Sequence, residues 1–245
     1  AGVDTSQVVF SDDMITPLAS VLVNRLTGSR TIITRKMQTP PSLTYEQKLK
    51  LDDLAERLIA SEEPVTILID GHEPEISEYL IKKLPNARVV MDGGSLRASN
   101  IKLAAWTDYF VVSEHFARDY MSYRSLSTEA EIKAALIELN KICRGEAFIT
   151  LGEKGCAFLK SGMLQIVPSW LCNAVDTTGA GDVFHGAFTY GVHYSWHIDN
   201  IILFASLTAA ISIEKKGVRE SMPDLAVVHH SLNSYERNLK QYFEE

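Results

Sequence analysis

Residues 174–188, A-V-D-T-T-G-A-G-D-V-F-H-G-A-F, gather the residue types that phosphate chemistry uses. Gly179, Ala180 and Gly181 come directly before Asp182, and apolar residues at helical spacing follow. A helix that begins here presents amide groups without intrahelical partners, and its dipole places about +0.5 charge at that end. Such an end attracts phosphate oxygens, and small residues let the backbone approach them closely. The spacing therefore predicts an anion-binding loop with a carboxylate beside it.

A carboxylate in this place suits phosphoryl transfer, which needs positioning, charge stabilisation and one base to take the hydroxyl proton. We predict that Asp182 is this base; the alternative is a simple helix cap, since Asp is favoured there. The alternative for the three small residues is turn geometry alone. The sequence has no G-x-x-x-x-G-K-[ST] motif, and Phe184 stands where a dinucleotide fingerprint has its third glycine. P-loop nucleotidases and the usual NAD dehydrogenases are therefore poor fits.

The composition predicts a cytoplasmic globular protein with neither nucleic acid nor a membrane as its partner. Its 245 residues are 46% hydrophobic, which suffices for one large core. The net charge is -7, and no basic run exceeds a pair of lysines, whereas nucleic-acid binding needs a basic stripe. The most apolar stretch, residues 204–213, is far shorter than the roughly 18 residues of a membrane span. Three scattered cysteines without a C-x-x-C pair predict reduced thiols.

Strand and helix patterns alternate along the chain and have to position the loop. Residues 7–10, 19–24 and 30–34 are rich in β-branched residues, which predicts a strand followed by a hairpin. T-Y-E-Q at 44–47 and T-E-A-E at 128–131 are capping boxes that predict helix starts. Short apolar runs predict buried strands at 65–69, 87–91, 109–112, 147–151, 156–160 and 164–167. Further helices are predicted near 75–84, 100–107, 114–122, 180–194, 197–214 and 224–243.

This alternation predicts an α/β fold with a three-layer parallel sheet. Such sheets bind ligands at the carboxyl ends of their strands. The loop before Asp182 is expected at that edge. His72 and Asp92 each follow a predicted strand, so both are expected at the same edge. Their alternatives are a surface-loop histidine and a turn aspartate beside two glycines.

The motif at 174–188 closely resembles the C-terminal signature of the PfkB, or ribokinase-like, carbohydrate kinases. The resemblance includes the opening G-V-D-T-S, the hairpin with Gly28 and Arg30, I-T-L-G-E-K-G at 149–155, and the stretch 209–223. It implies a ribokinase-like fold with a small β-sheet lid, of which residues 6–35 would form a part. It also implies ATP and Mg²⁺ as cofactors, and transfer of the γ-phosphoryl group to a sugar hydroxyl. Lids in this family often pair between subunits, which predicts a homodimer.

Residue by residue, the resemblance assigns the catalytic base to Asp182 and the anion hole to the three small residues before it. Thr150, Gly152 and Gly155 match a turn on the nucleotide side; the alternative is a plain strand-to-strand turn. Asp176 and Thr178 resemble, with the backbone around Gly217, the loop pair that holds a monovalent cation such as K⁺ in some members.

The resemblance adds His72, Asp92 and His185 as candidates for contact with the sugar. His185 stands where many members have Asn, and its alternative is to pack in the core.

The stretch V-V-S-E-H-F-A departs from the family pattern. Many members have an Asn and, three residues on, a Glu that helps to organise magnesium; here these places hold Ser113 and Phe116. Glu114 is a candidate substitute for the metal. The departure is more similar to the ketohexokinase-type and sulfofructose-kinase-type branches, which favours a ketose as substrate.

The early sugar-binding segments of the family pattern do not precede the opening A-G-V-D-T-S. Two hypotheses follow. The first is an ATP-dependent sugar kinase whose N-terminal segment lies outside this sequence. The second is a shortened, catalytically weak relative that binds a nucleotide or a partner chain.

Overall fold

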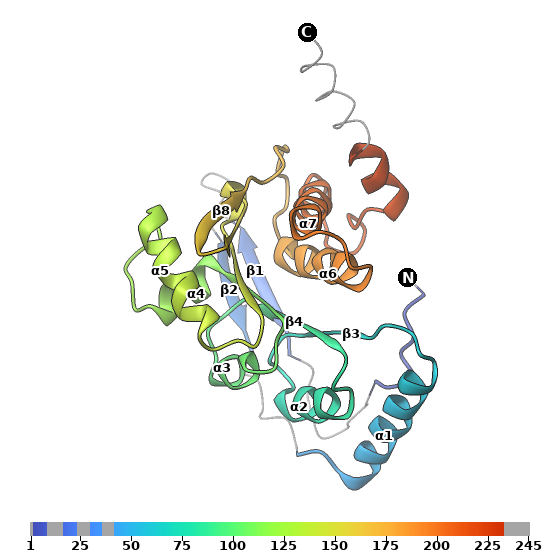
Figure 1. The fold of residues 1–245 in the computed structure, drawn as a ribbon. Coiled ribbons are helices and arrows are strands. Elements are labelled where there is room, and N and C mark those ends of the chain that lie inside the picture. Colours follow the sequence, from blue (N-terminus) through green and yellow to red (C-terminus); the bar gives the residue numbers. More distant parts are fainter. Residues whose placement is uncertain (1, 9–16, 24–29, 36–41, 233–245) are drawn as a thin grey trace. The chain divides into compact units, whose positions relative to one another are not determined.

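The structure is a computed structural model that describes residues 2–8, 17–23, 30–35 and 42–232 (Figure 1). The chain divides into two compact units, residues 1–54 and 55–245. The boundary between the units falls within helix α1 (Tyr45–Ala60). No helix of the described ranges is long and apolar enough to span a lipid bilayer.

The first unit contains the predicted hairpin. Strands β1 (Ala19–Val23) and β2 (Arg30–Thr34) pair antiparallel, with Ala19 opposite Thr34, while the turn between them lies outside the described residues. The prediction of a strand from Gln7 is wrong for Gln7 and Val8. These residues form a turn, in which the Val8 amide donates to the Thr5 carbonyl at 3.0 Å. The remainder of that stretch is outside the described residues.

Helix α1 begins at the predicted capping box. The Thr44 amide donates to Gln47 Oε1 at 2.9 Å, and the Gln47 amide donates to Thr44 Oγ1 at 3.2 Å. Two donors that a helix start leaves unpaired are thereby satisfied. Thr128 and Glu131 form the second capping box, at the start of α5.

The second unit is built on a six-stranded sheet of order β3-β4-β5-β6-β7-β8. Its strands are β3 (Thr66–Ile69), β4 (Arg88–Gly93), β5 (Tyr109–Ser113), β6 (Glu146–Thr150), β7 (Cys156–Lys160) and β8 (Met163–Val167). Strands β3 to β6 run parallel, whereas β7 and β8 are antiparallel. The sheet is therefore mostly parallel, because the short connections on either side of β7 only permit hairpins.

The helices are α2 (Pro74–Lys83), α3 (Ala98–Ala104), α4 (Glu114–Tyr120), α5 (Glu129–Asn140), α6 (Ala180–His193) and α7 (Ile198–Ile213), with a 3-10 turn η1 (Gly152–Lys154). Each α-helix lies where the sequence predicted one. A further helix covers residues 225–232, and the rest of its predicted span is outside the described part of the chain.

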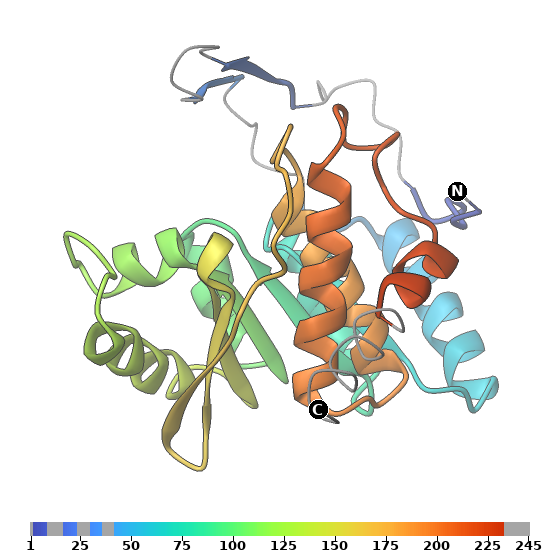
Figure 2. The same cartoon turned by 90° about the horizontal axis from the view of Figure 1, so that it is seen from above.

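Alternate residues of the central strands face opposite layers. Val89 and Met91 belong to a core cluster with α2 to α5, whereas Val90 belongs to a second cluster with α6 and α7. Figure 2 shows α6 and α7 on one side of the sheet and α4 and α5 on the other. Burial on both faces explains why these strands are continuous apolar runs. The three-layer α/β prediction is confirmed.

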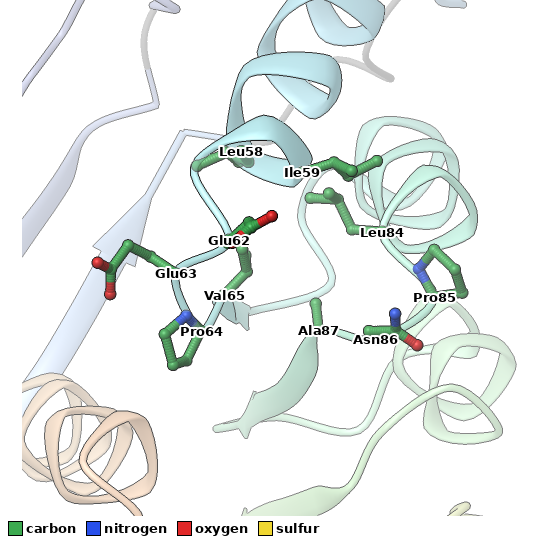
Figure 3. Close-up of a pocket in the computed structure, with 10 residues that line it drawn as sticks. All are labelled: Leu58, Ile59, Glu62, Glu63, Pro64, Val65, Leu84, Pro85, Asn86 and Ala87. Carbon is green, nitrogen blue, oxygen red and sulfur yellow. The ribbon is translucent and has the colours of Figure 1, made fainter.

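A cavity of 390 Å³ lies at the amino-terminal edge of the sheet (Figure 3). The end of α1 contributes Ile59 and the residue after α2 contributes Leu84, while Val65 and Ala87 precede β3 and β4. The candidate chemical residues follow the strands instead, so this cavity is not the predicted site.

Candidate functional site

The loop before α6 adopts the geometry that the glycines predicted. Gly179 has a left-handed backbone, φ +74°, and is the last residue before the helix. Its carbonyl accepts the Val183 amide at 2.9 Å, which starts the helical hydrogen-bond ladder. A non-glycine residue is strained at this φ. Gly179 is therefore required for the abrupt entry into α6.

The first turn of α6 offers free backbone donors. The Ala180 amide reaches the Thr177 carbonyl at 3.3 Å, while the Gly181 and Asp182 amides have no acceptor among the residues that the structure describes. Gly181 is exposed, and a Cβ built there would meet no atom within 4 Å. An anion can therefore approach this turn of the backbone, as the helix dipole favours.

Asp182 lies in that first turn with its side chain exposed. Asp92, the fifth residue of β4, lies close enough for Asp182 to act on it electrostatically. Burial raises the pKa of Asp92; His185 opposes the shift, and Asp182 and Asp70 add to it. The structure thus brings together two predicted residues from separate elements, Asp92 and Asp182, with a carboxylate that the sequence analysis missed, Asp70.

His185 is buried, with 2% of its surface exposed. Its Nδ1 lies 2.7 Å from the Gly181 carbonyl oxygen and 3.3 Å from Asp92 Oδ2, and its Nε2 lies 3.1 Å from the Val111 carbonyl oxygen. The ring therefore connects β4, β5 and the first turn of α6.

His72 lies in the turn after β3, half-buried. Its amide donates to Asp70 Oδ1 at 2.9 Å, the pattern of an Asx turn. Asp70 follows β3 much as Asp92 closes β4, a positional repeat that could have identified it from the sequence. The described contacts place the His72 backbone at the ligand-binding edge and do not join its side chain to Asp182.

A cleft of 560 Å³ opens beside this edge, at the ends of β5 and β6. Thr150 and Gly152, two of the three predicted nucleotide residues, line it. Two arginines that the sequence analysis did not predict as site residues, Arg118 and Arg124, line the cleft as well. Arg118 donates to Asp119 Oδ1 at 2.8 Å, and this bond holds the pKa of Asp119 below its usual range. Arg124 is exposed, and none of the described ion pairs involves it.

Gly155 has a structural role in the hairpin between β6 and β7. Its φ is +103°, a Cβ there would lie 2.0 Å from the Val167 carbonyl oxygen, and its own carbonyl accepts the Leu151 amide at 2.7 Å. Gly155 is not among the residues that line the cleft. The hairpin therefore explains this glycine without a ligand.

Asp176 ties the loop before α6 to the loop after α7. Its Oδ1 accepts the Thr178 amide at 3.0 Å and its Oδ2 accepts the Gly217 amide at 3.3 Å. The two loops that the family resemblance pairs around a monovalent cation are thus joined through one carboxylate.

The departures at the end of β5 have structural reasons. Ser113 caps α4: its Oγ accepts the Phe116 amide at 3.0 Å and donates to the Gly94 carbonyl at 2.9 Å. Phe116 is fully buried against Phe110, with ring centroids 5.5 Å apart. Glu114, half-buried in the first turn of α4, is the carboxylate that lines the cleft.

One carboxylate suits Mg²⁺ only if substrate phosphates complete its coordination, which is how Mg²⁺ commonly binds. Among the described residues, no group of three or more His, Cys, Asp or Glu is arranged to hold a metal ion. The donor set therefore fits a magnesium ion that arrives with a nucleotide.

The mostly parallel α/β sheet, the glycine-initiated helix and the acid in its first turn match the arrangement that the family resemblance predicts. The solved ribokinase of Giardia lamblia superposes with a TM-score of 0.75 at 20% identity, over 89% of this chain and 72% of that one. The ribokinase of Arabidopsis thaliana, solved with ribose and ATP, gives a TM-score of 0.70 at 20% identity, over 89% and 69%. These likenesses show the fold.

The chain belongs to the pfkB family of carbohydrate kinases, whose family model matches residues 1–225. A curated relative, the ribokinase of Lactococcus lactis, is 29% identical over 192 residues, which are 77% of this chain and 60% of the relative. The chain therefore spans less than two thirds of the length of that relative. The resemblance drawn from the 174–188 motif is confirmed.

Proposed function

We propose that this protein is an ATP-dependent sugar kinase. The observation that carries the proposal is the first turn of α6, where the exposed Asp182 stands beside amides without acceptors among the described residues. Phosphoryl transfer needs this combination of a proton acceptor and a preorganised anion site.

In the proposed reaction a sugar hydroxyl oxygen attacks the γ-phosphorus. The bond between that phosphorus and the bridging oxygen breaks, ADP leaves, and the hydroxyl proton passes to Asp182. The amides of Gly181 and Asp182 take up the charge that develops on the phosphoryl oxygens. The left-handed backbone of Gly179 sets the direction of these amides. The small side chain of Ala180 leaves room for the phosphoryl oxygens to approach the backbone.

The nucleotide is proposed to occupy the cleft at the ends of β5 and β6. Thr150 and Gly152 offer a hydroxyl and a close backbone there, and Arg124 offers a positive charge without a described partner. Glu114 would hold the Mg²⁺ of Mg-ATP, which supplies charge neutralisation on the phosphates. Asp176, Thr178 and the Gly217 loop are the proposed place for K⁺.

For the substrate we propose a pentose, with ribose tested first. The relatives to which the chain is similar include proteins named as ribokinase and deoxyribokinase, whereas the Ser113 departure in the sequence favoured a ketose. His72 and Asp92 remain the candidates for sugar contact. A partial lid formed by residues 6–35, a homodimer and a cytoplasmic location stay proposals.

The test is Mg-ATP-dependent release of ADP by the purified chain with ribose, deoxyribose, fructose or a sulfosugar. Stimulation by ribose well above the sugar-free rate supports the proposal. Stimulation by fructose alone would instead favour a ketose as the substrate. Tight ATP binding by calorimetry without turnover of any sugar would favour the alternative, a catalytically weak relative that binds a nucleotide or a partner.

A further inference from the structure

His185 has protein acceptors at both of its ring nitrogens. Nδ1 faces the Gly181 carbonyl at 2.7 Å, and Nε2 faces the Val111 carbonyl at 3.1 Å. A carbonyl oxygen can only accept, so the ring satisfies both contacts only when both nitrogens carry protons. A doubly protonated ring is the form that fits both contacts.

The surroundings of the ring compensate this positive charge. Asp92 on β4 places Oδ2 3.3 Å from Nδ1, with its side chain 18% exposed. Asp182 from α6 and Asp70 from the turn after β3 are the other charged groups that act on Asp92. Asp92 is therefore the carboxylate that pairs with a charged ring, as burial of a charge requires.

The three contacts of the ring fasten the helix start to the sheet. Gly181 belongs to the turn whose free amides form the proposed anion site, and Asp182 is the next residue. Val111 and Asp92 lie on adjacent parallel strands and are register partners. The ring thus connects β4 and β5, whose register is fixed by their pairing, to the first turn of α6. That turn carries the proposed base and the amides proposed to bind the phosphoryl group.

We propose that His185 is a positioning residue, a charged brace that fixes the first turn of α6 against β4 and β5 so that Asp182 and the neighbouring amides keep their reactive geometry. This inference rests on the proposed kinase function. Since both nitrogens are occupied and the ring is buried, His185 has no hydrogen-bonding atom left for a sugar, which separates this role from substrate contact.

The test compares two amides at one position. In His185→Asn the side-chain amide reaches the place of Nδ1 and keeps the Gly181 contact, whereas in His185→Gln it reaches the place of Nε2 and keeps only the Val111 contact. We expect His185→Gln to lower kcat by about 10²-fold, the effect of a misplacement of about 1 Å. His185→Asn gives up the Val111 end of the brace and the charge of the ring, so it should lower kcat as well, and neither variant should change the KM for the sugar.

His193→Asn is the matched control, because His193 ends the same helix and, among the described residues, its Nδ1 meets only Thr66 Oγ1, at 3.3 Å. It should have wild-type kinetics. Equal kcat for wild type and His185→Gln would overturn the proposal, and so would a raised sugar KM with kcat unchanged, which indicates substrate contact. In a double-mutant cycle, Asp92→Asn should lower kcat less in the His185→Gln background than in the wild type; additive effects contradict the pairing.

A second readout is independent of activity. A long-range ¹H–¹⁵N spectrum of the histidine-labelled wild-type protein should show two protonated ring nitrogens for His185, assigned by the signal lost in His185→Asn. A single protonated nitrogen on His185 overturns the brace. Absence of sugar-dependent ADP release in the wild type with an intact imidazolium signal would instead refute the kinase proposal alone.

Discussion

Replacement of Gly179 by alanine tests whether the left-handed entry into α6 carries the site. A non-glycine residue in the left-handed region costs about 1–2 kcal/mol. The added Cβ would also lie 2.6 Å from Val218 Cγ1, and such overpacking costs about 1–3 kcal/mol. We therefore expect Gly179→Ala to lower the free energy of unfolding by about 2–5 kcal/mol. For a domain of this size each kcal/mol lowers Tm by about 2–4 °C.

Two controls separate the causes of that loss. Gly162 has φ +76° in the turn between β7 and β8, and a Cβ there meets nothing within 4 Å. Gly162→Ala should therefore show the backbone cost alone, about 1–2 kcal/mol, with unchanged kinase activity. Val218→Ala removes the methyl groups that the new Cβ would meet. In a Val218→Ala background, Gly179→Ala should therefore cost only the backbone term, about 1–2 kcal/mol.

The assay is thermal unfolding by circular dichroism, paired with sugar-dependent ADP release. Gly179→Ala should lose activity at temperatures where it is fully folded, because the amides of the first turn change direction. If Gly179→Ala unfolds at the same temperature as Gly162→Ala and retains wild-type turnover, the argument from φ and the Val218 contact is refuted.

Three further predictions concern other parts of the site and surface. Gly181→Ala has no steric cost in the free protein and should raise stability by about 0.5–1 kcal/mol, yet it should raise the KM for ATP because the Cβ obstructs phosphate; unchanged kinetics would contradict this. Arg124→Ala should raise the KM for ATP about tenfold with kcat unchanged, since a bond to a charged group contributes about 1.5 kcal/mol; an unchanged KM would place the phosphates elsewhere. Hydrogen bonds from Lys102 and then Lys82 hold the pKa of Glu78 below 4.5, so its stabilisation is present above that pH and is lost as pH falls through the lower folded-state value. Glu78→Gln should therefore cost about 0.2–1 kcal/mol at pH 7 and nothing near pH 2, as measured by urea unfolding.

The fold could be predicted because local signals agreed with tertiary packing. The capping boxes at Thr44 and Thr128 mark helix starts through contacts within three residues, and the strands buried on both faces read as apolar runs. The turn at Thr5–Val8 was missed because β-branched content near Val8 does not reveal a local hydrogen bond to the Thr5 carbonyl. The direction of β7 likewise follows from a short connection through Gly155 rather than from its composition.

The site could be predicted only where a motif is continuous in sequence. Gly179 to Asp182 are consecutive, so their spacing alone indicated an anion loop. The association of His185 with Asp92 and Val111 depends on strand register across about 70 to 90 residues of chain, which no local pattern encodes. Arg124 was missed because an exposed arginine in a loop looks like ordinary surface until the ends of β5 and β6 are placed beside it.

The most direct measurement of the central claim is single-turnover transfer of the γ-phosphoryl group from labelled ATP to ribose by Asp182→Asn. Asn keeps the shape of the side chain but cannot take the hydroxyl proton, so transfer should fall by about 10²–10⁴-fold while the ATP Kd by calorimetry stays at the wild-type value. Glu129→Gln is the matched control, because Glu129 is also an exposed acid in a first helical turn, and it should transfer at the wild-type rate. Transfer by Asp182→Asn at the wild-type rate would contradict the account, because the first turn of α6 would then not supply the base.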